Sequence, residues 1–327
     1  MTQILDRVVA GIAKKPTIGV VGLSSWDTLL AVGIMPPPGG FAMVSSAMEL
    51  PGGTSANAAA AAAALGARVE LISAVGDDET GRRLLETLTR AGIDCSRVRI
   101  DPDKPTDQTT VITSEQPPDR TIFWREGAIP LRGDRIDIDR LFTRDLVLLD
   151  SVDPFLRRFL IDLPVHTYPD VKILVPMTYV VDFPGADEFH SVVRCDALVG
   201  SAQELQQLTG SSSLDEAIVT MQDTMRVANL RSVAVTLGAD GGLAFDAERI
   251  YRAPALVANV VDTTGAGDAF AGAFGVGLAS RLGLSDALEL ANCVAGLSVR
   301  SIGAQTGLPS FDEVAAVLRT RSSQAPE

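Results

Sequence analysis

The sequence predicts a doubly wound α/β fold, in which a mostly parallel sheet lies between two helix layers and carries a small antiparallel β flap (lid). Two observations predict the core: short, unbroken apolar runs recur along the 327 residues, and helical patterns separate them. Strands that are buried on both faces give such runs, and helices between strands impose parallel pairing. We expect one domain over residues 1–327.

The apolar runs define the expected strands of this sheet, and helical patterns fall between them. The six runs, in chain order, are Ile18–Leu23, Val69–Val75, Leu146–Asp150, Val171–Val175, Ala197–Gly200 and Ser232–Leu237. Helices are expected at, for example, Gly81–Ala91 and Leu214–Ala228. Residues 58–64 are all alanine, the strongest helix former, and a later run, Leu256–Val261, also has strand character.

Two segments break the alternation, and we interpret them as a lid inserted into the domain at about residues 27–50 and 106–128. The first contains Pro36–Gly40 between apolar stretches, and the second contains the strand-like stretches TTVITSE and RTIFWR. Pro117, Pro118 and Asp119 join those two stretches. Proline followed by aspartate favours a turn, because the proline φ is fixed and the aspartate side chain can bond the backbone.

Composition and charge exclude several classes of protein. The formal net charge is −13 with no basic block, which argues against a nucleic-acid or anionic-membrane surface. Three scattered cysteines and two histidines provide neither a disulfide framework nor a Cys or multi-His metal site. No signal-peptide core or membrane-length apolar stretch is present, so a cytoplasmic protein is expected.

The strongest motif is DTTGAGD at residues 262–268, which is followed by the helical pattern AFAGAFGVGLAS. A glycine-rich loop that opens a helix directs unpaired amides and the positive end of the helix dipole at one point, which makes an anion site. Gly265 and Gly267 would let an anion approach the backbone. Asp268, in the first helical turn, either complements the dipole or acts as a base beside a bound phosphoryl group. The Walker A pattern is absent.

Two further polar positions fall where open α/β sheets bind ligands. In PGGTSAN at residues 51–57, Thr54 or Ser55 would suit a helix cap. Asn57 is a lone amide at the start of the alanine helix, so it faces either solvent or a polar ligand. Asp27 follows the first strand.

These motifs resemble those of the ribokinase-like carbohydrate kinases, the phosphofructokinase-B group. DTTGAGDAFAGAF is similar to the C-terminal signature of the family, and GGTSANAAAAAAALGARVELISAVGDDETG is similar to its N-terminal signature. The resemblance covers essentially the whole chain. It implies a ribokinase-like fold and ATP-dependent phosphorylation of a hydroxymethyl group on a small sugar or sugar-like substrate.

The resemblance also implies roles for individual residues. Asp268 would be the catalytic base, and the amides of Gly265, Ala266 and Gly267 would form the anion hole. The positions expected at the sugar are Asp27, Gly53, Asn57 and Asp150. The positions expected at the nucleotide are Thr236, Gly238, Gly241 and Asn292, although Asn292 would equally suit a helix surface.

Two cations are implied by the same resemblance. Glu204 would act on Mg²⁺ through water, but Ser201 stands where the family usually has Asn. A hydroxyl offers fewer hydrogen bonds than an amide. A monovalent cation such as K⁺ is expected beside the anion hole, at Asp262, Thr264, Ser298, Ser301 and Gly303.

Alternatives remain for the function and the substrate. A nucleoside kinase of the same fold would need an aromatic base slot, for which Phe123 and Trp124 are the candidates. A catalytically silent ligand-binding regulator would not need both Asp268 and the GAG loop. Thr54 stands where ribokinases carry Lys, which argues against ribose. A phosphorylated substrate would require a basic clamp, and the cations in or near the lid are Lys104, Arg120 and Arg125.

The lid also predicts an assembly. A small sheet with one uncovered apolar face is marginally stable in water, and twofold pairing of two lids would cover it. We therefore expect a homodimer through the lid. The residues expected in the contact come from Val32, Ile34, Phe41, Met43, Ile112, Ile122 and Trp124.

Overall fold

The computed structural model describes the backbone of residues 4–185, 187–256 and 259–324. Within these residues a nine-stranded sheet has the order β15-β14-β13-β12-β11-β10-β1-β4-β6. Its strands from β6 to β13 pair in parallel, and β14 and β15 add an antiparallel edge. The strands are β1 (Thr17–Gly22), β4 (Arg68–Ile72), β6 (Ile93–Asp94), β10 (Leu146–Asp150), β11 (Lys172–Pro176), β12 (Ala197–Ser201), β13 (Ser232–Thr236), β14 (Gly242–Phe245) and β15 (Ile250–Ala253).

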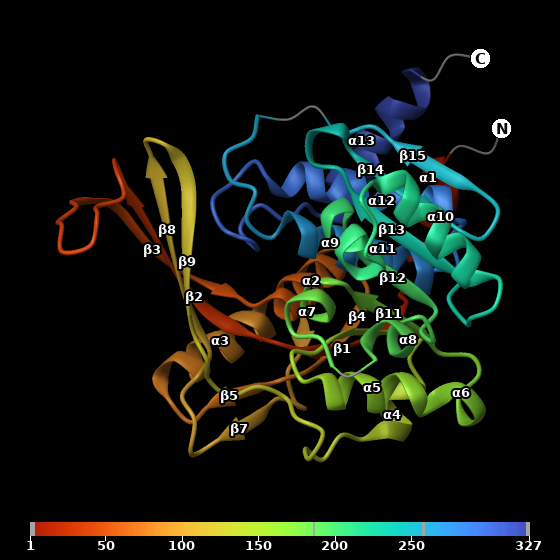
Figure 1. The fold of residues 1–327 in the computed structure, drawn as a ribbon, viewed down its shortest axis with the longest axis horizontal. Coiled ribbons are helices and arrows are strands. Elements are labelled where there is room, and N and C mark those ends of the chain that lie inside the picture. Colours follow the sequence, from red (N-terminus) through yellow and green to blue (C-terminus); the bar gives the residue numbers. More distant parts are fainter. Residues whose placement is uncertain (1–3, 186, 257–258, 325–327) are drawn as a thin grey trace.

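Helices cover both faces of this sheet, as the sequence predicts (Figure 1). One core lies under α1 (Ile4–Ile12), α2 (Thr54–Ala64), α3 (Glu79–Arg90), α11 (Ala266–Ala279), α12 (Leu284–Ser298) and α13 (Phe311–Gln324). The other lies under α4 (Ile138–Phe142), α5 (Pro154–Asp162), α7 (Thr178–Asp182), α8 (Glu188–Val192), α9 (Ala202–Thr209) and α10 (Leu214–Met225), and the short α6 (Pro164–Thr167) follows α5. Among the described residues, no helix is long and apolar enough to cross a membrane.

The alanine-rich helix α2 packs directly on α11. A Cβ added to Gly272 of α11 would lie 2.3 Å from the Ala58 carbonyl oxygen of α2. Only small side chains permit backbones to approach this closely, which explains why α2 is built almost entirely from alanine. The contact brings the N-termini of both helices to the same edge of the sheet.

The lid is a second, four-stranded sheet that projects from one side of the body (Figure 1). Its strands, in the order β3-β2-β8-β9, are β2 (Ser25–Val32), β3 (Val44–Gly52), β8 (Gln108–Glu115) and β9 (Pro118–Arg125). The two outer pairs are antiparallel, as expected, whereas β2 and β8 pair in parallel because both leave the core in the same direction. A separate pair, β5 (Ala74–Gly76) with β7 (Arg99–Asp101), lies near α3.

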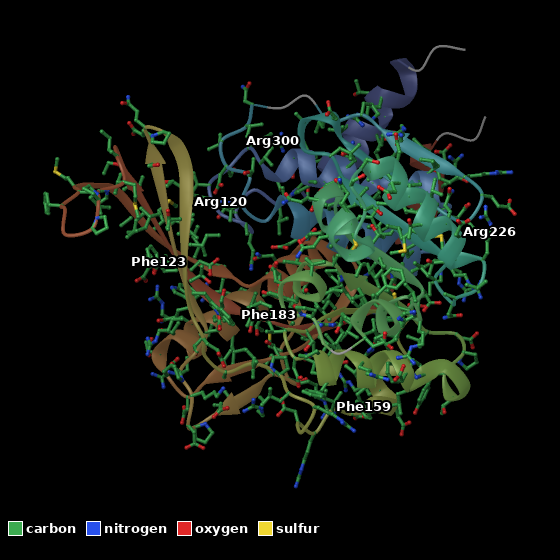
Figure 2. The ribbon with its side chains drawn as sticks, in the orientation of Figure 1. Arg120, Phe123, Phe159, Phe183, Arg226 and Arg300 are labelled. Carbon is green, nitrogen blue, oxygen red and sulfur yellow. The ribbon has the colours of Figure 1, made fainter. Side chains whose placement is uncertain are left out.

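Strand register decides which lid residues face the body. Asp27, Thr109 and Trp124 are paired across β2, β8 and β9, so they share one face. Arg120 lies further along β9 on that face, and Phe123 lies on the opposite one, as Figure 2 shows. On the opposite face at the base of the lid, the Arg83 guanidinium of α3 lies 4.7 Å from the ring centroid of Trp26.

One expected strand is wrong. In the described part of Leu256–Val261 no strand forms, and residues 257–258 lie outside the described residues. The edge of the sheet is β15 instead, which pairs antiparallel with β14. Val260 and Val261 are exposed, so the apolar character of this run does not come from burial in a sheet.

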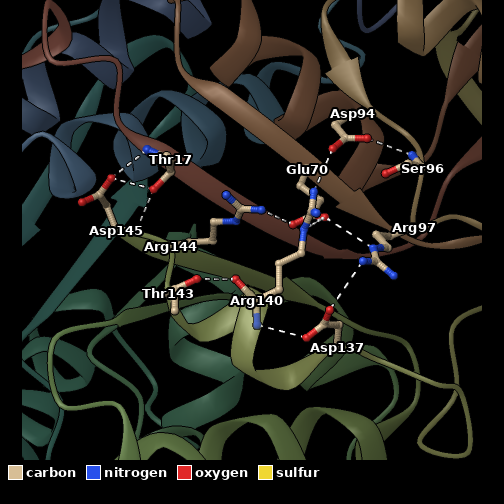
Figure 3. A network of polar contacts seen from close by, with 10 residues as sticks. All are labelled: Thr17, Glu70, Asp94, Ser96, Arg97, Asp137, Arg140, Thr143, Arg144 and Asp145. Carbon is tan, nitrogen blue, oxygen red and sulfur yellow. Dashed lines mark hydrogen bonds and ion pairs between the residues drawn. The ribbon is translucent and has the colours of Figure 1, made fainter.

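The buried carboxylate of Glu70 links β4 to α4 (Figure 3). The Glu70 side chain of β4 is only 4% exposed and forms ion pairs of 2.6 Å with Arg140 Nε and 2.6 Å with Arg144 Nη2. Arg97 lies 4.0 Å away and also pairs with Asp137. Because Arg140 and Arg144 lie in and just after α4 and Arg97 lies in the turn before β7, the Glu70 carboxylate links β4 to two other parts of the chain.

We expect Glu70→Gln to lower the free energy of unfolding by about 1.5–3 kcal/mol, because hydrogen bonds to charged groups are lost beneath α4. Urea unfolding followed by circular dichroism measures this change. Glu49→Gln is the matched control, since Glu49 pairs with Arg83 where both side chains are about half exposed; such surface pairs contribute at most about 1 kcal/mol. Equal effects of the two substitutions would contradict the structural role of Glu70.

Candidate active site

The candidate site lies where the carboxyl ends of β1, β10, β12 and β13 meet the N-termini of α2 and α11. Two cavities adjoin there. The first has a volume of about 180 Å³ and the second about 330 Å³. Thr236 and Gly267 line both, so they form the wall that the two cavities share. In parallel sheets this edge is the usual place for ligands.

The smaller cavity is acidic. Its lining includes the carboxylates of Asp150, Glu204 and Asp268 together with the polar side chains of Thr54 and Ser201. No Lys or Arg occurs among the described residues that line it. An anionic ligand in this cavity would therefore need a cation to accompany it.

The larger cavity contains all four positions expected at a nucleotide. Thr236, Gly238, Gly241 and Asn292 line it beside apolar residues such as Phe270. Asn292 is buried in α12, and its Nδ2–H donates to the backbone oxygen of Pro254. The alternative expectation of a helix-surface residue is therefore wrong for Asn292.

Asp268 lies in the first turn of α11 and is held by a relay of amides. Asn57 Nδ2–H donates to Asp268 Oδ2 at 2.8 Å, and Gln305 Nε2–H donates to Asn57 Oδ1 at 2.9 Å. Burial raises the pKa of Asp268 to about 7; the hydrogen bond from Asn57 opposes this, and the negative charge of Asp150 adds to it. Asn57 thus faces a polar group in the site and not solvent.

The glycine loop before α11 has one position that requires glycine. Gly265, the N-cap of α11, has φ 75°, and a Cβ there would lie 2.3 Å from Ala304 Cβ. Gly267 is different, because a Cβ there would meet nothing within 4 Å and φ is ordinary. A side chain at position 267 would project into the cavities, so glycine here leaves space for a ligand and is not required by the backbone. The Ala266 N–H already donates to the Thr263 carbonyl oxygen at 3.2 Å.

Asp150, at the end of β10, is almost fully buried and lines the smaller cavity. Ser55 Oγ–H donates to Asp150 Oδ2 at 3.1 Å, whereas Asp150 Oδ1 has no partner among the described residues. Burial raises the pKa of Asp150 to about 6, and hydrogen bonds from Thr54 and Ser55 oppose this rise.

The expectation that Thr54 or Ser55 caps α2 is wrong. The N-cap is Gly53, with φ 89° and no side-chain hydrogen bond. A Cβ on Gly53 would lie 2.6 Å from the Ser24 Cα, so this glycine permits the helix to begin against the end of β1. The two hydroxyls are instead directed at the site, since Thr54 Oγ1–H donates to the Tyr179 hydroxyl at 3.3 Å.

Asp27 lies at the base of the lid. Ser25 Oγ–H donates to Asp27 Oδ1 at 2.7 Å. Burial raises the pKa of Asp27 to about 6, and the hydrogen bonds from Ser25 and Thr109 oppose this rise. The charge of Asp27 also helps to raise the pKa of Asp268, which places Asp27 within electrostatic range of the reacting end of the site.

Glu204 has local partners that explain Ser201. Ser201 is the N-cap of α9, and its Oγ accepts a hydrogen bond from the Glu204 N–H at 3.1 Å. In return, Glu204 Oε2 accepts the Ser201 N–H at 2.6 Å, which completes a capping box. Glu204 Oε1 accepts the Thr178 hydroxyl at 2.7 Å. The capping box and the Thr178 hydroxyl therefore fix the orientation of Glu204 at the cavity wall.

The five positions expected at a monovalent cation lie on two neighbouring loops and the end of α12. Asp262 joins the loops: Oδ1 accepts from the Thr264 N–H at 2.9 Å, and Oδ2 accepts from the Gly303 N–H at 2.8 Å. These hydrogen bonds outweigh burial and lower the pKa of Asp262. Ser298 donates to the Ala295 carbonyl oxygen at 2.9 Å, and Ser301 lies near Gly307. No group of three or more His, Cys, Asp or Glu suited to a metal occurs among the described residues.

Three site residues carry no signal in the sequence. Gln305 lies in a loop, Tyr179 lies in a short helix, and Asp107 comes directly before the lid strand β8. Gln305 and Tyr179 reach the site through hydrogen bonds with Asn57 and Thr54, and Asp107 is bonded by the lid residue Trp124. By contrast, the capping box at Ser201 could have been found, because Ser-x-x-Glu before an apolar helix is its pattern.

The chain is similar to known proteins over most of its length. The family model described as pfkB family carbohydrate kinase matches residues 43–310. A ribokinase of Lactococcus lactis is 28% identical over 92% of this chain and 97% of that protein. An ATP-dependent ribose-1-phosphate kinase of Halopiger xanaduensis is 30% identical over 92% of this chain and 97% of that protein.

The solved structures confirm the expected fold. The structure of Arabidopsis thaliana ribokinase complexed with ribose and ATP matches with a TM-score of 0.82 at 24% identity, over 93% of this chain and 99% of that chain. The ribokinase-like architecture, with its layered parallel sheet and small second sheet, is therefore confirmed. The chain belongs to the pfkB family of carbohydrate kinases, and it is a sugar kinase.

Proposed function

We propose that the protein transfers the γ-phosphoryl group of ATP to a hydroxymethyl group of a small sugar, with Asp268 as the general base. The observation that carries this proposal is the position of Asp268: it is a buried carboxylate at the N-terminus of α11, on the wall of the smaller cavity. The sugar hydroxyl oxygen attacks the γ-phosphorus, its proton passes to the Asp268 carboxylate, and ADP leaves. Such transfers depend mainly on positioning and charge stabilisation.

The two cavities suggest how the substrates divide the site. The larger, mostly apolar cavity suits adenosine, and the shared wall of Thr236 and Gly267 suits the phosphate chain that leads to the smaller cavity. The N-terminus of α11 supplies a positive dipole end there. Because the Ala266 N–H is engaged by Thr263, the anion hole we propose relies on the amides of Gly265 and Gly267.

The sugar would lie between Asp268 and the base of the lid. Asn57 and Asp27 flank that space, and Gly53 lies beside it at the start of α2. Asp150 adds a buried carboxylate on the side of the smaller cavity. Charged acceptors of this kind bind hydroxyl groups strongly. Closure of the lid over the sugar would exclude water, which otherwise competes as the phosphoryl acceptor.

The acidic cavity fits Mg²⁺, which is usually bound by one or two carboxylates, waters and substrate phosphates. Glu204, on the wall of this cavity, would hold it through water. When bound, Mg²⁺ neutralises charge on the ATP phosphates. The loops joined by Asp262 would hold K⁺ through backbone oxygens near Thr264, Ser298, Ser301 and Gly303.

A nucleoside acceptor is less well supported. A base slot requires two roughly parallel walls, but the rings of Trp124 and Phe183 meet edge to face, with an interplanar angle of 67°. Phe123 lies on the other face of β9 and cannot complete a slot with Trp124. The named relatives act on different sugars: one is a ribokinase and the other a ribose-1-phosphate kinase.

We also propose that two copies pair through their lids. Phe41 is 90% exposed, and Ile34, Met43 and Phe123 are more than half exposed on or beside the lid. Val32 does not belong to this surface, because it is 4% exposed within the single chain. Ile122 and Trp124 share the face of Asp27, so the partner would contact the opposite face and the loop between β2 and β3.

Asp268→Asn tests the proposed base. We expect kcat to fall by about 10²–10⁴ while ATP binding is retained, because only proton acceptance is lost. Asp215→Asn is the matched control: Asp215 also lies in the first turn of a helix but is exposed. Initial-rate kinetics with ATP and a sugar panel measure the effect. A variant that keeps more than about a tenth of wild-type kcat would exclude Asp268 as the base.

The same substitution should stabilise the protein above neutral pH. The pKa of Asp268 is raised from 3.8 to about 7 in the folded state, so between these values the folded chain binds more protons and stability falls as pH rises. Asp268→Asn removes this loss. We expect its melting temperature to exceed that of wild type by roughly 2–6 °C at pH 8, with the difference shrinking toward pH 5. A lower melting temperature at pH 8 would contradict this electrostatic account.

The pH dependence of catalysis follows from the same group. A general base must be deprotonated, so kcat/KM for the sugar should rise with pH through a pKa near 7. At pH 6 the rate should be about a tenth of its plateau value. A profile that is flat between pH 5.5 and 8, measured with saturating ATP, would show that Asp268 does not limit the reaction.

Light scattering tests the lid dimer. We expect the mass of a dimer at micromolar concentration, and a monomer for the double variant Phe41→Asp and Phe123→Asp, because burying two new charges opposes association. Phe155→Asp is the control, as Phe155 is an exposed phenylalanine on α5, away from the lid. A monomeric wild-type protein, or a dimer that survives the double substitution, would refute the proposed interface.

A further inference from the structure

Asp107 is a buried carboxylate at the junction between the core and the lid. Its side chain is 0% exposed. Trp124 Nε1–H donates to Asp107 Oδ2 at 2.8 Å, and the Gly127 N–H donates to the same oxygen at 3.1 Å. Asp107 Oδ1 is buried and has no hydrogen-bond partner among the described residues. A buried acceptor without a protein partner is costly unless a water or a ligand supplies a donor.

The position of Asp107 relates this free oxygen to the proposed sugar site. Asp107 directly precedes β8, whose Thr109 pairs with Asp27 on β2. Burial raises the pKa of Asp107 to about 6, and the charge of Asp27 adds to that rise. The charge of Asp27 also acts on Asp268. Asp27 therefore lies within electrostatic range of both carboxylates, the proposed base and the one at the lid.

Aromatic contacts hold this end of the lid against the core. The ring of Trp124 lies 5.9 Å from that of Phe183, which lies 6.0 Å from that of Tyr179 in α7. Figure 2 shows Phe183 on the body of the molecule, beside α7. Burial and the charges of Asp150, Asp268 and Asp107 raise the pKa of Tyr179. These contacts fix the ring whose N–H orients Asp107.

The charges around this space are negative. The carboxylates there belong to Asp27, Asp107, Asp150, Glu204 and Asp268. The nearby arginines interact with other groups. Arg157 helps to lower the pKa of Asp150 but forms its ion pair with Glu188. Arg120 lies further out on the lid, where its charge helps to lower the pKa of Asp262. An anionic group on the sugar would meet repulsion at this end of the site, whereas a hydroxyl would find an acceptor.

We propose that Asp107 determines substrate specificity: its free oxygen accepts a hydrogen bond from the sugar at the end remote from the reacting hydroxymethyl group, which restricts the acceptor to uncharged sugars and polyols. This inference rests on the proposed function and specifies its substrate class. Asp107 positions and selects the acceptor and takes no proton in the reaction.

The test compares wild type with Asp107→Asn. Asparagine has the same shape and can still accept from Trp124 and Gly127, but it presents a donor where the free oxygen was. The substrates are D-ribose, D-xylose, D-glucose and D-fructose, each against anionic counterparts, ribose 1-phosphate and D-gluconate. We expect wild type to prefer an uncharged sugar, and Asp107→Asn to raise its KM about ten- to a hundredfold with kcat within about threefold.

Two further variants make the result specific. Asp103→Asn removes an exposed carboxylate from the same segment between β7 and β8. It should leave KM and kcat unchanged. Trp124→Phe keeps a ring but removes the donor that orients Asp107, so it should also raise KM; it serves if Asp107→Asn fails to fold. An unchanged KM in the folded Asp107 variant, or in Trp124→Phe, overturns the assignment. A wild-type preference for ribose 1-phosphate or D-gluconate also overturns it and would point to Arg120.

Binding without ATP separates this inference from the proposed function. Isothermal titration of the same sugars should show an uncharged sugar binding to wild type and binding more weakly to Asp107→Asn. If no sugar is phosphorylated but this pattern is found, the proposed function fails and the assignment of Asp107 stands. If phosphorylation occurs but titration shows equal binding to both proteins, Asp107 has no part in specificity.

Discussion

The burial of Asp268 at the start of α11 is the constraint on which the rest of the site depends. A carboxylate with a pKa near 7 requires a dry environment, nearby negative charge and few compensating donors. The close packing of α2 on α11 supplies that environment and brings Asn57 to 2.8 Å from the carboxylate. The alanines of α2 are therefore as important to the chemistry as the residues that touch it, because larger side chains would separate the two helices.

The same packing concentrates negative charge. Asp27, Asp150, Glu204 and Asp268 influence one another, and burial opposes the ionisation of three of them. Such an arrangement lowers the stability of the empty protein. It favours ligands that bring positive charge or hydrogen-bond donors, which a sugar and the Mg²⁺ of a nucleotide complex would do. Binding of such ligands would relieve the repulsion among these carboxylates. Groups with perturbed pKa values are common at catalytic sites.

The sequence predicts what depends on local pattern. Apolar runs mark six strands because parallel strands are buried on both faces, and the loop of Gly265 marks a helix N-terminus. The run at Leu256–Val261 misleads because an exposed, cavity-lining loop is as apolar as a strand. Thr54 and Ser55 look like caps until the fold brings Tyr179 and Asp150 to them. Contacts made only through the tertiary fold leave no local signature.

Asp107 is a residue whose proposed role follows from tertiary contacts alone. Nothing in its sequence neighbourhood distinguishes it from a solvated turn residue, and its meaning comes from the register of β8 with β2 and β9. That register aligns Trp124 with Thr109 and brings the indole N–H to Asp107 Oδ2. Because the lid strands carry both this orienting donor and Asp27, any shift of the lid moves acceptor and donor together. Substrate selection at this end of the site is therefore coupled to the position of the lid, whereas Asp268 is held in place by α2 and α11 and feels the lid through the charge of Asp27.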